Sequence, residues 1–405
     1  MLPRRIVIVA MTAITVLLAG CASSAVSPGS TLTFWAYEPN SKAQKDALET
    51  LVAAFEGEHG AEVKITYVPK DSFNTKLNSA IAVGRNPDVS YLDQPLTPRF
   101  VADGLLLDVT SRLNAGIGSE SFYPAAMKTA TIDGRVYAVP LSMTTVCLFY
   151  NKALVAEPPS TWDEWVESAR DVYSPGEVAA FEGIGSGGYS GWIFPALVHS
   201  GGGSMVNNQE TTATFGEETG IEAAKLLVAL QSYSDQSIRE SQNSFGNGDV
   251  AYNISGPWDI AALQTNFPDL DFGVALIPAS AGHESISSIG GENLVVFANS
   301  AQHDLAYEFV EYLTNANGQN TMAGVTGDFA TNLGAAVTIK YTSDPYLSVF
   351  LEQMKTAVAR PALKDWLKVN DEIIGFALDQ ILVSGADPAV VLTEANSHAN
   401  EVLFG

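Results

Sequence analysis

The sequence has little cysteine and little positive charge for its length. Two of its 405 residues are cysteine, Cys21 and Cys147, and 21 lysines and arginines stand against 45 aspartates and glutamates. The formal net charge of −24 argues against nucleic acid as a partner, because such a chain would repel phosphates. Cys147 lies in the apolar run TTVCLFYN, which indicates a buried, inert thiol.

The common catalytic and metal-binding motifs are missing as well. The chain contains no G-x-S-x-G, no P-loop and no H-E-x-x-H. Its five histidines show no ligand-like spacing, so we expect no metal site. The stretch GIGSGG lacks the lysine of a phosphate-binding loop and predicts a turn. The sequence therefore predicts neither an enzyme nor a cofactor, although a glycosidase pair could go unnoticed among so many acids.

The one long apolar run lies at the N-terminus. Two arginines precede an apolar stretch over residues 6–19, which has signal-peptide length and is short for a membrane span. The following LLAGC resembles the lipobox of bacterial lipoproteins, in which cleavage leaves the cysteine as a lipid-modified N-terminus. We therefore expect residues 1–20 to be a signal peptide, Cys21 to carry lipid, and residues 21–30 to form a linker. An uncleaved signal anchor is the alternative.

Periodicity in the mature chain predicts two α/β lobes. The mature length exceeds what one hydrophobic core usually supports. Strand patterns at residues 31–37, 62–68 and 87–93 alternate with helical patterns at 45–60 and 74–84. This order predicts a parallel sheet with right-handed crossovers. After residue 150 the pattern becomes more helical.

Short local signals predict where several elements begin and end. Asn40 or Ser41 can cap the first helix, and Gly60 can end it. The stretch TWDE, which begins at Thr161, is a capping box that opens a helix. The dipeptide Asp133-Gly134 lies between two strand patterns and predicts a hairpin.

Aromatic residues beside polar groups recur where predicted elements end. Ligands of open parallel sheets bind beyond the carboxyl ends of the strands. Flat rings suit the apolar face of a pyranose, and carboxylates and amides suit its hydroxyl rim. We therefore expect a sugar site built from these groups. They are Trp35, Tyr37 and Glu38; Asp93 and Gln94; Tyr189 and Trp192; Trp258 and Asp259; Gly291, Glu292 and Asn293; and Arg360 and Trp366.

Four stretches, in order, resemble the carbohydrate-binding proteins of ABC importers, of the maltose-binding type. They are NPDVSYLDQPLTPRFVADGLLLDVT, GRVYAVPLSMTTVCLFYNKALV, STWDEW and NSFGNGDVAYNISGPWDIAAL. The resemblance covers nearly the whole mature chain and follows a lipobox. It identifies the chain as similar to family 1 extracellular solute-binding proteins. The fold it implies is α/β and periplasmic-binding-protein-like of type II, with two lobes, three hinge crossings and a sugar in the cleft.

The resemblance also implies how the chain is divided between the lobes. The crossings would fall near Met143, Gly290 and Ala330. The expected lobe 1 contains residues 31–142 and 293–329, and the expected lobe 2 contains residues 143–292 and 330–405.

Residue roles follow from the same resemblance. It implies that Trp258 stacks on the sugar, that Asp93 bonds hydroxyls, and that residues 189–192 supply contacts from lobe 2. Thr144 or a neighbour stands where maltose binders carry a site glutamate, which leaves the identity of the sugar open. Trp366 matches the late aromatic residue of the family in approximate position.

The function expected from these features is that of a substrate-binding lipoprotein of a carbohydrate ABC importer. It would be anchored by lipid to the outer face of the bacterial cytoplasmic membrane and act as a monomer. It would capture a di- or oligosaccharide such as an α-glucoside, with trehalose as one candidate, and deliver it to permease subunits served by a cytoplasmic ATPase. Two alternatives stay open. One is a binder of an amino sugar or other cationic solute, and the other is a lipid-anchored glycoside hydrolase.

Overall fold

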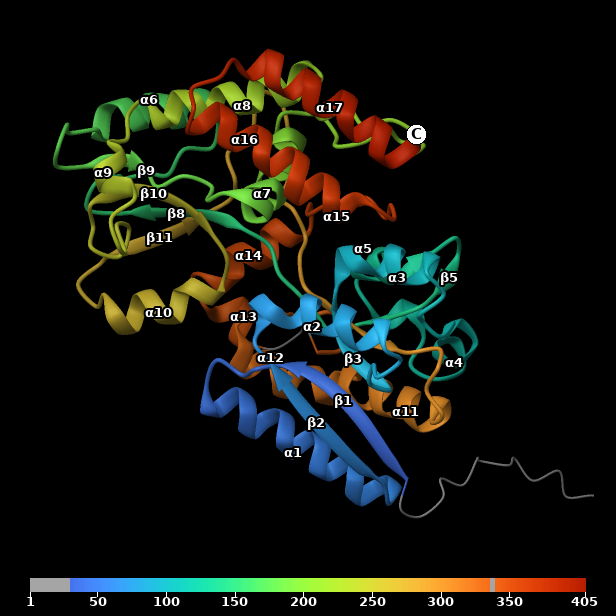
Figure 1. Ribbon diagram of the computed structural model, residues 1–405. Coiled ribbons are helices and arrows are strands. Elements are labelled where there is room, and N and C mark those ends of the chain that lie inside the picture. The colour runs from blue at the N-terminus through green and yellow to red at the C-terminus, as the bar shows by residue number, and fades with distance from the viewer. Residues whose placement is uncertain (1–29, 336–338) are drawn as a thin grey trace, which may run out of the picture.

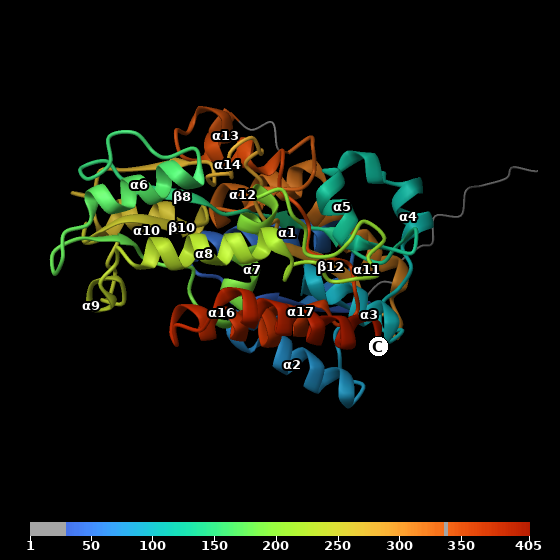
Figure 2. The ribbon, with the colours of Figure 1, turned by 90° about the horizontal axis from the view of Figure 1, so that it is seen from above.

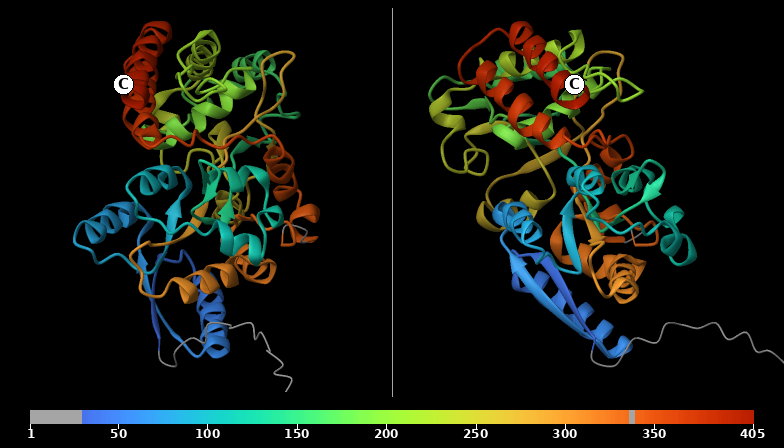
Figure 3. Two further views of the ribbon diagram at one scale, coloured as in Figure 1. Left: turned by 90° about the vertical axis from the view of Figure 1, so that its right-hand side faces the viewer. Right: turned by 45° about the vertical axis from the view of Figure 1, so that its right-hand side comes forward.

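The computed structural model describes residues 30–335 and 339–405, and in it two α/β lobes lie one above the other (Figures 1 and 3). Lobe 1, the lower one in Figure 1, carries the N-terminal strands, and lobe 2 carries the C-terminal helices. The expected signal peptide, the lipid-modified Cys21 and the linker lie outside the described residues, apart from Ser30. No helix within the described ranges is long and apolar enough to cross a membrane.

Lobe 1 is built on a five-stranded sheet in the order β2-β1-β3-β12-β6. Strand β1 runs parallel to β2 and β3, which confirms the predicted βαβ start, whereas β12 runs antiparallel to β3 and β6. The strands are β1 Thr31–Tyr37, β2 Glu62–Val68, β3 Val89–Asp93, β6 Val139–Pro140 and β12 Glu292–Val296.

Helices cover both faces of this sheet. The predicted caps of the first helix are confirmed, because the Ser41 side chain accepts the Gln44 N–H and Gly60 adopts a left-handed conformation. The hairpin at Asp133-Gly134 is confirmed as β4 Thr131–Ile132 and β5 Arg135–Val136. The helices are α1 Lys42–His59, α2 Lys70–Ala82, η1 Gln94–Leu96, α3 Thr97–Ala102, α4 Thr110–Ala115, η2 Ser119–Ser121, α5 Pro124–Ala130, α11 His303–Thr314 and α12 Ala316–Thr326.

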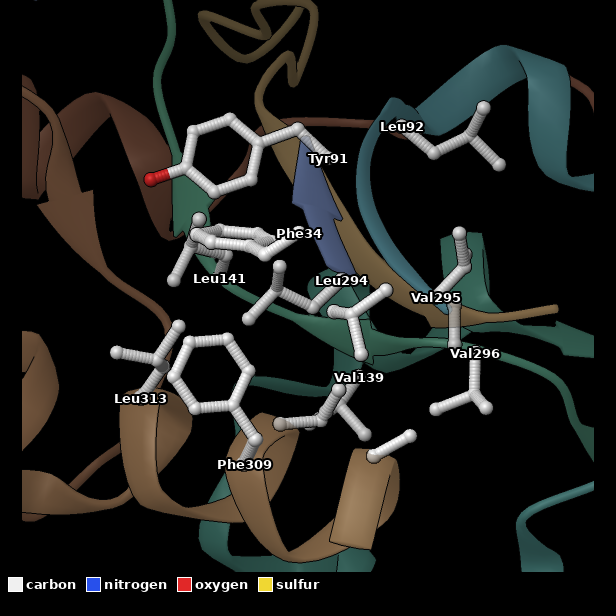
Figure 4. Close-up of a cluster of buried hydrophobic side chains, with 14 of the residues drawn as sticks. Phe34, Tyr91, Leu92, Val139, Leu141, Leu294, Val295, Val296, Phe309 and Leu313 are labelled. Atoms are coloured by element: carbon white, nitrogen blue, oxygen red, sulfur yellow. The ribbon is translucent and has the colours of Figure 1, made fainter. Parts of the chain in front are cut away.

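The core of lobe 1 forms where aromatic and branched side chains meet between the sheet and α11. Figure 4 shows Phe34 of β1 between Tyr91 and Phe309. The ring centroids of Phe34 lie 5.6 Å from Tyr91 and 5.1 Å from Phe309, in edge-to-face arrangements that aromatic rings favour. This packing fixes β3, whose last residue reaches the functional site.

Lobe 2 has a four-stranded sheet in the order β11-β8-β10-β9. Figure 2 shows α8, α16 and α17 gathered over this lobe, where they pack on one another. The capping box predicted at Thr161 is confirmed, with both of its hydrogen bonds present. The strands are β8 Cys147–Asn151, β9 Ala179–Phe181, β10 Val250–Ser255 and β11 Phe272–Ala275. The helices are α6 Trp162–Val172, α7 Gly187–Ser200, α8 Glu218–Gln231, α9 Gln236–Arg239, α10 Trp258–Asn266, α15 Trp366–Lys368, the π-helical turn η3 Val369–Ile374, α16 Gly375–Leu382 and α17 Pro388–Phe404.

Three chain segments lie side by side where the lobes meet. Strand β7 Ser142–Met143 pairs with β13 Phe329–Ala330, and Thr144 forms a two-way backbone bridge with Gly290. The cores on either side draw on different parts of the chain, residues 32–141 and 294–313 below and mainly residues 146–277 and 366–399 above. A third cluster at the joint includes α13 Ile339–Ser343 and α14 Leu347–Met354. The exact division of the chain between the lobes stays a prediction.

Candidate functional site: a cleft between the lobes

A cleft of about 1110 Å³ lies between the lobes and is lined from both of them. Lobe 1 contributes the end of β3, the start of β12 and the start of α2. Lobe 2 contributes the first turns of α7 and α10 and the turn η3. Ligand sites of α/β folds are expected beyond the carboxyl ends of strands, and β3 and β10 both end here.

Aromatic rings form one wall of the cleft, on lobe 2. Tyr189 and Trp192 come from the first turns of α7, and Trp258 opens α10. The ring centroid of Trp192 lies 5.9 Å from that of Tyr189 and 6.0 Å from that of Trp258. Trp258 is 37% exposed and Tyr189 is 40% exposed, although large aromatic side chains are normally buried. The rings therefore form a continuous apolar surface that a flat ligand can cover.

A glycine lies against each of these rings. A Cβ atom at any of the three glycines would come within 3 Å of the ring, so a larger residue would displace it. The separations between such a Cβ and the nearest ring atom are 2.9 Å for Gly185 and Tyr189, 2.8 Å for Gly290 and Trp192, and 2.0 Å for Gly256 and Trp258.

Carboxylates form the opposite wall, on lobe 1, and two of them have a cation. The Arg360 Nη2 lies 3.3 Å from Asp93 Oδ1, and the Lys70 Nζ lies 3.0 Å from Glu292 Oε1. Ser142 Oγ donates to the other Glu292 oxygen at 2.9 Å. Burial raises the pKa of Asp93, and the Arg360 guanidinium partly offsets this. These pairs hold charged hydrogen-bond acceptors at the cleft surface without leaving their charges uncompensated.

Asp328 is a third carboxylate on the lobe 1 side, at the start of the crossing strand β13. Burial, together with the nearby charge of Glu292, raises its pKa to about 7, whereas Lys70 acts in the opposite direction. Sequence reasoning missed this residue because its aromatic neighbour, Phe329, did not lie at the end of a predicted element.

Lobe 2 adds polar groups around the aromatic wall. Glu182 accepts from Ser244 and Asp259 accepts from Ser255, and burial raises the pKa of each carboxyl. Asp371 in η3 lies close to the first turn of α7, where a Cβ on Gly188 would come 2.6 Å from its Oδ1. A π-helical turn at a cleft is a common feature of functional sites.

Nine of the fifteen predicted site residues line this cleft. They are Asp93, Thr144, Tyr189, Trp192, Trp258, Asp259, Gly291, Glu292 and Arg360. Tyr37 and Glu38 instead line a smaller adjoining pocket, together with Glu292.

The structure places two further predicted residues in hydrophobic surroundings. Trp366 is fully buried in the core of lobe 2, because the short helix α15 turns its indole away from the cleft. Trp35 lies on the opposite side of β1 from Phe34 and packs edge-on against Phe73 of α2. Strand alternation explains the position of Trp35. We leave both residues out of the proposed ligand site.

Two predicted amides are likewise internal. The Asn293 side chain is fully buried and donates to Thr97 Oγ1 at 3.1 Å, so it ties β12 to α3. Gln94 is also buried, and its Nε2 lies 3.4 Å from the Ser142 carbonyl. Both follow a cleft residue directly in sequence and thus face the other side of the chain.

Several polar residues line the cleft that sequence reasoning did not select. They either have no aromatic neighbour or lie in stretches that sequence reasoning did not select, such as Phe181-Glu182 and Tyr252-Asn253. They are Asn40, Lys70, Asn74, Glu182, Asn253, Ser255, Asp328, Asn370 and Asp371. Over the described residues, no group of three or more histidine, cysteine or acidic side chains is placed to hold a metal ion.

Comparisons with known proteins agree with this geometry. The chain is 27% identical over 337 residues to the galactooligosaccharide-binding protein of Bacillus subtilis, with 76% of each chain covered. It is 26% identical over 315 residues to the diacetylchitobiose binding protein DasA of Streptomyces coelicolor, covering 74% of this chain and 72% of that one. The GacH receptor of Streptomyces glaucescens has been solved unliganded and with acarbose. It superposes with a TM-score of 0.79 at 26% identity, over 93% of this chain and 99% of that one.

The superposition confirms the predicted two-lobed, type II binding-protein fold. Residues 50–348 match the family described as bacterial extracellular solute-binding protein. The chain therefore belongs to the bacterial extracellular solute-binding proteins, and it is a binding protein, not an enzyme.

Proposed function

We propose that this protein captures a di- or oligosaccharide in the cleft and delivers it to the permease of an ABC importer. The observation that supports the proposal is that the cleft has an aromatic wall on lobe 2 and a carboxylate wall on lobe 1. Three aromatic rings on lobe 2 face a lobe 1 wall of charged acceptors across one cleft. An α-glucoside fits this arrangement, and trehalose is one candidate.

Each wall suits one part of a sugar. The C–H face of a pyranose can cover Trp258 and Trp192, which lose little conformational entropy because each has few rotatable bonds. Hydroxyl groups can donate to Asp93 and Glu292, and a hydrogen bond to a charged acceptor contributes about 1.5–3 kcal/mol. The relatives named for galactooligosaccharide and diacetylchitobiose, and the GacH receptor solved with acarbose, support this ligand class.

Lobe closure would convert binding into a signal for transport. A ligand that contacts both lobes binds the closed state better than the open state, and it shifts the population by that difference. Hinge closure of two lobes around a ligand is a known kind of domain motion, and here it would bring the two walls together. A shift from mostly open to mostly closed needs about 5.5 kcal/mol of differential affinity, which a stacked ring and a few charged hydrogen bonds can supply.

The N-terminal features suit this role. A signal peptide and lipid on Cys21 would hold the protein at the outer face of the cytoplasmic membrane, beside the permease. Globomycin sensitivity of processing, together with mass spectrometry of the mature N-terminus, tests the anchor. An unmodified cysteine would remove the anchor from the proposal without affecting the cleft.

The proposed ligand class can be tested by thermal shift followed by calorimetry. A panel of glucose, trehalose, maltose, maltotriose, raffinose and galactobiose should contain at least one sugar that raises the melting temperature, because a ligand of the native state stabilises it by mass action. A panel in which no saccharide binds, while a polyamine or an amino acid does, would contradict the proposal.

One observation favours a second candidate, a cationic solute such as an amino sugar. Among the described residues, eight carboxylates line the cleft against three cations. The affinity of a cationic ligand would fall as salt is added, whereas stacking and neutral hydrogen bonds respond little. Titrating glucosamine and glucose at two salt concentrations separates the two candidates.

A further inference from the structure

A second cavity extends from the cleft into lobe 1, and we call it the side pocket. Its volume is about 140 Å³, and it shares Lys70, Glu292 and Asp328 with the cleft. An engineered cavity of about 150 Å³ in another protein holds one benzene molecule. The side pocket therefore has the size of one six-membered ring.

A contact between two helices borders the side pocket beside Asn40 and Thr326, which line both the side pocket and the cleft. Gln44 of α1 donates from Nε2 to the Val325 carbonyl of α12 at 3.2 Å, and its Oε1 accepts the Asn40 N–H at 2.8 Å. These bonds join the start of α1 to the end of α12. Because the two cavities share lining residues, a ligand can enter the side pocket from the cleft.

The lining of the side pocket divides into an apolar part and a polar rim. Leu48, Leu141, Met322, Ala323 and Phe329 supply the apolar part. Lys70, Glu292 and Asp328 lie on the side shared with the cleft, where Lys70 is also 5.2 Å from the centroid of the Tyr37 ring, and Glu38, Gln44 and Gln319 add further polar groups. A pyranose has the same division, with C–H faces and a rim of hydroxyl groups.

Asp328 stands out on this rim. Glu292 is paired with Lys70 and bonded by Ser142, and Glu38 is exposed to solvent. Among the residues that the structure describes, no side chain donates a hydrogen bond to the Asp328 carboxylate and no cation lies within 4 Å of it. A half-buried carboxylate without a donor has lost part of its hydration, so its position favours a ligand that supplies a donor.

We propose that the side pocket receives the terminal unit of the bound saccharide and that Asp328 accepts hydrogen bonds from the hydroxyl groups of this unit. This inference rests on the proposed function and adds the orientation of the ligand. One end of the chain is enclosed in lobe 1, and the remaining units extend along the cleft toward Trp258.

This arrangement makes the two ends of the ligand unequal. A bulky group on the enclosed unit has no room, because the side pocket has the volume of about one ring. A bulky group on the other end lies in the wider cleft and is tolerated.

The test uses the full mature protein and the saccharide from the panel above that binds it with highest affinity. Ala323→Leu narrows the side pocket, and Asn320→Leu, on the exposed side of the same helix, is its matched control. Asp328→Asn removes the charged acceptor, and Asp269→Asn at an exposed position is its control. Thermal unfolding of each variant shows whether it is folded.

We expect Ala323→Leu and Asp328→Asn each to weaken binding at least tenfold, while both controls stay within twofold of the wild type. The saccharide is also tested with a naphthyl group at either end, and one of the two derivatives should lose binding. Equal tolerance of both derivatives, or unchanged affinity in Asp328→Asn, would overturn the side-pocket assignment and leave the proposed function standing. Failure of every saccharide to bind the wild type would overturn both. Should Ala323→Leu fail to fold, Asp328→Asn and the two derivatives decide.

Discussion

The two walls of the cleft bind in different ways and are stabilised differently. On lobe 1 the acceptors Asp93 and Glu292 are each held by a cation, so they are fixed before a ligand arrives. On lobe 2 the rings of Trp258 and Tyr189 remain over a third exposed, and glycines leave the space in which they lie. The charged wall would orient the ligand through hydrogen bonds, and the aromatic wall would supply apolar contact area.

This difference shows why the lobes would have to close on a ligand. A sugar on the aromatic wall alone would leave its hydroxyls facing water, and a sugar on the charged wall alone would leave the rings exposed. Both gains are available only when the lobes approach each other, which links affinity to closure. The predictions below remove or alter one wall at a time.

Removing the Trp258 ring should have the largest effect. Trp258→Ala deletes an exposed indole at the start of α10. Loss of the apolar area that the ligand would cover, and of the stacking contact, should weaken saccharide binding about 50-fold. Calorimetry measures the loss. Phe376→Ala, which removes a 60% exposed ring outside the cleft, is the control and should leave affinity unchanged. Equal affinities of Trp258→Ala and the wild type would remove the aromatic wall from the account.

The charged wall should respond to pH through Asp328. Its pKa is about 7 in the folded protein, so a proton competes with ligand hydroxyls below that value, and affinity should fall about tenfold between pH 8 and pH 6. Asp328→Asn should flatten this dependence in calorimetric titrations. The charged and titratable groups that surround Asp328 are Glu292 of β12, Lys70 of α2, and Tyr37, Tyr91 and Tyr341.

The same group has the opposite effect on the stability of the free protein. Because the folded-state pKa of Asp328 is raised above its unfolded value of 3.8, the native state binds the proton more tightly. Its contribution to stability therefore increases as the pH falls from 7 toward 4. The melting temperature of Asp328→Asn should gain less than that of the wild type over this range. Parallel curves for the two proteins would contradict the assignment.

Displacing a ring without deleting it should have a smaller effect. An added Cβ at Gly256 would lie 2.0 Å from the Trp258 ring, so Gly256→Ala must tilt the ring and should weaken binding about fivefold. Gly57→Ala in α1, where a Cβ meets nothing within 4 Å, is the matched control. We expect the fluorescence spectrum of the protein to shift in Gly256→Ala only. An unchanged affinity would mean that the ring position is not critical.

The smallest effect is expected at ion pairs between the lobes that lie outside the cleft. Lys364 lies 3.6 Å from Asp103, and Asp365 lies 3.5 Å from Arg99, all with solvent-exposed side chains. Exposed pairs contribute about 0–1 kcal/mol, so Lys364→Gln should change affinity less than about twofold. A larger loss in calorimetry would show that these pairs, and not the two walls, govern closure.

Much of the fold could be predicted because local signals determine it. The residues at positions 48, 51, 52 and 55 form the buried face of α1, as their helical spacing predicts. The caps at Ser41 and Gly60, the capping box at Thr161 and the hairpin at Asp133-Gly134 all depend on neighbouring residues only. Such features do not need knowledge of distant contacts.

The parts of the site that sequence reasoning misplaced, missed or could not bring together depend on long-range packing. Trp366 looked like a ligand residue, but its position in the lobe 2 core is set by helices far away in sequence. The pairing of β12 antiparallel to β3 brings Glu292 beside Asp93, and no local pattern gives that register. Lys70 and Asp328 reach the site from α2 and β13 in the same way. Single residues on crossing segments carry no local signature.

The most direct test is a crystal structure of the protein with a saccharide identified by the panel. The account predicts one pyranose ring stacked on Trp258, hydroxyl groups within hydrogen-bond distance of Asp93 or Glu292, and lobes closer together than in the ligand-free crystal. A saccharide bound outside the cleft, or bound in it without contact to either wall, would contradict the account.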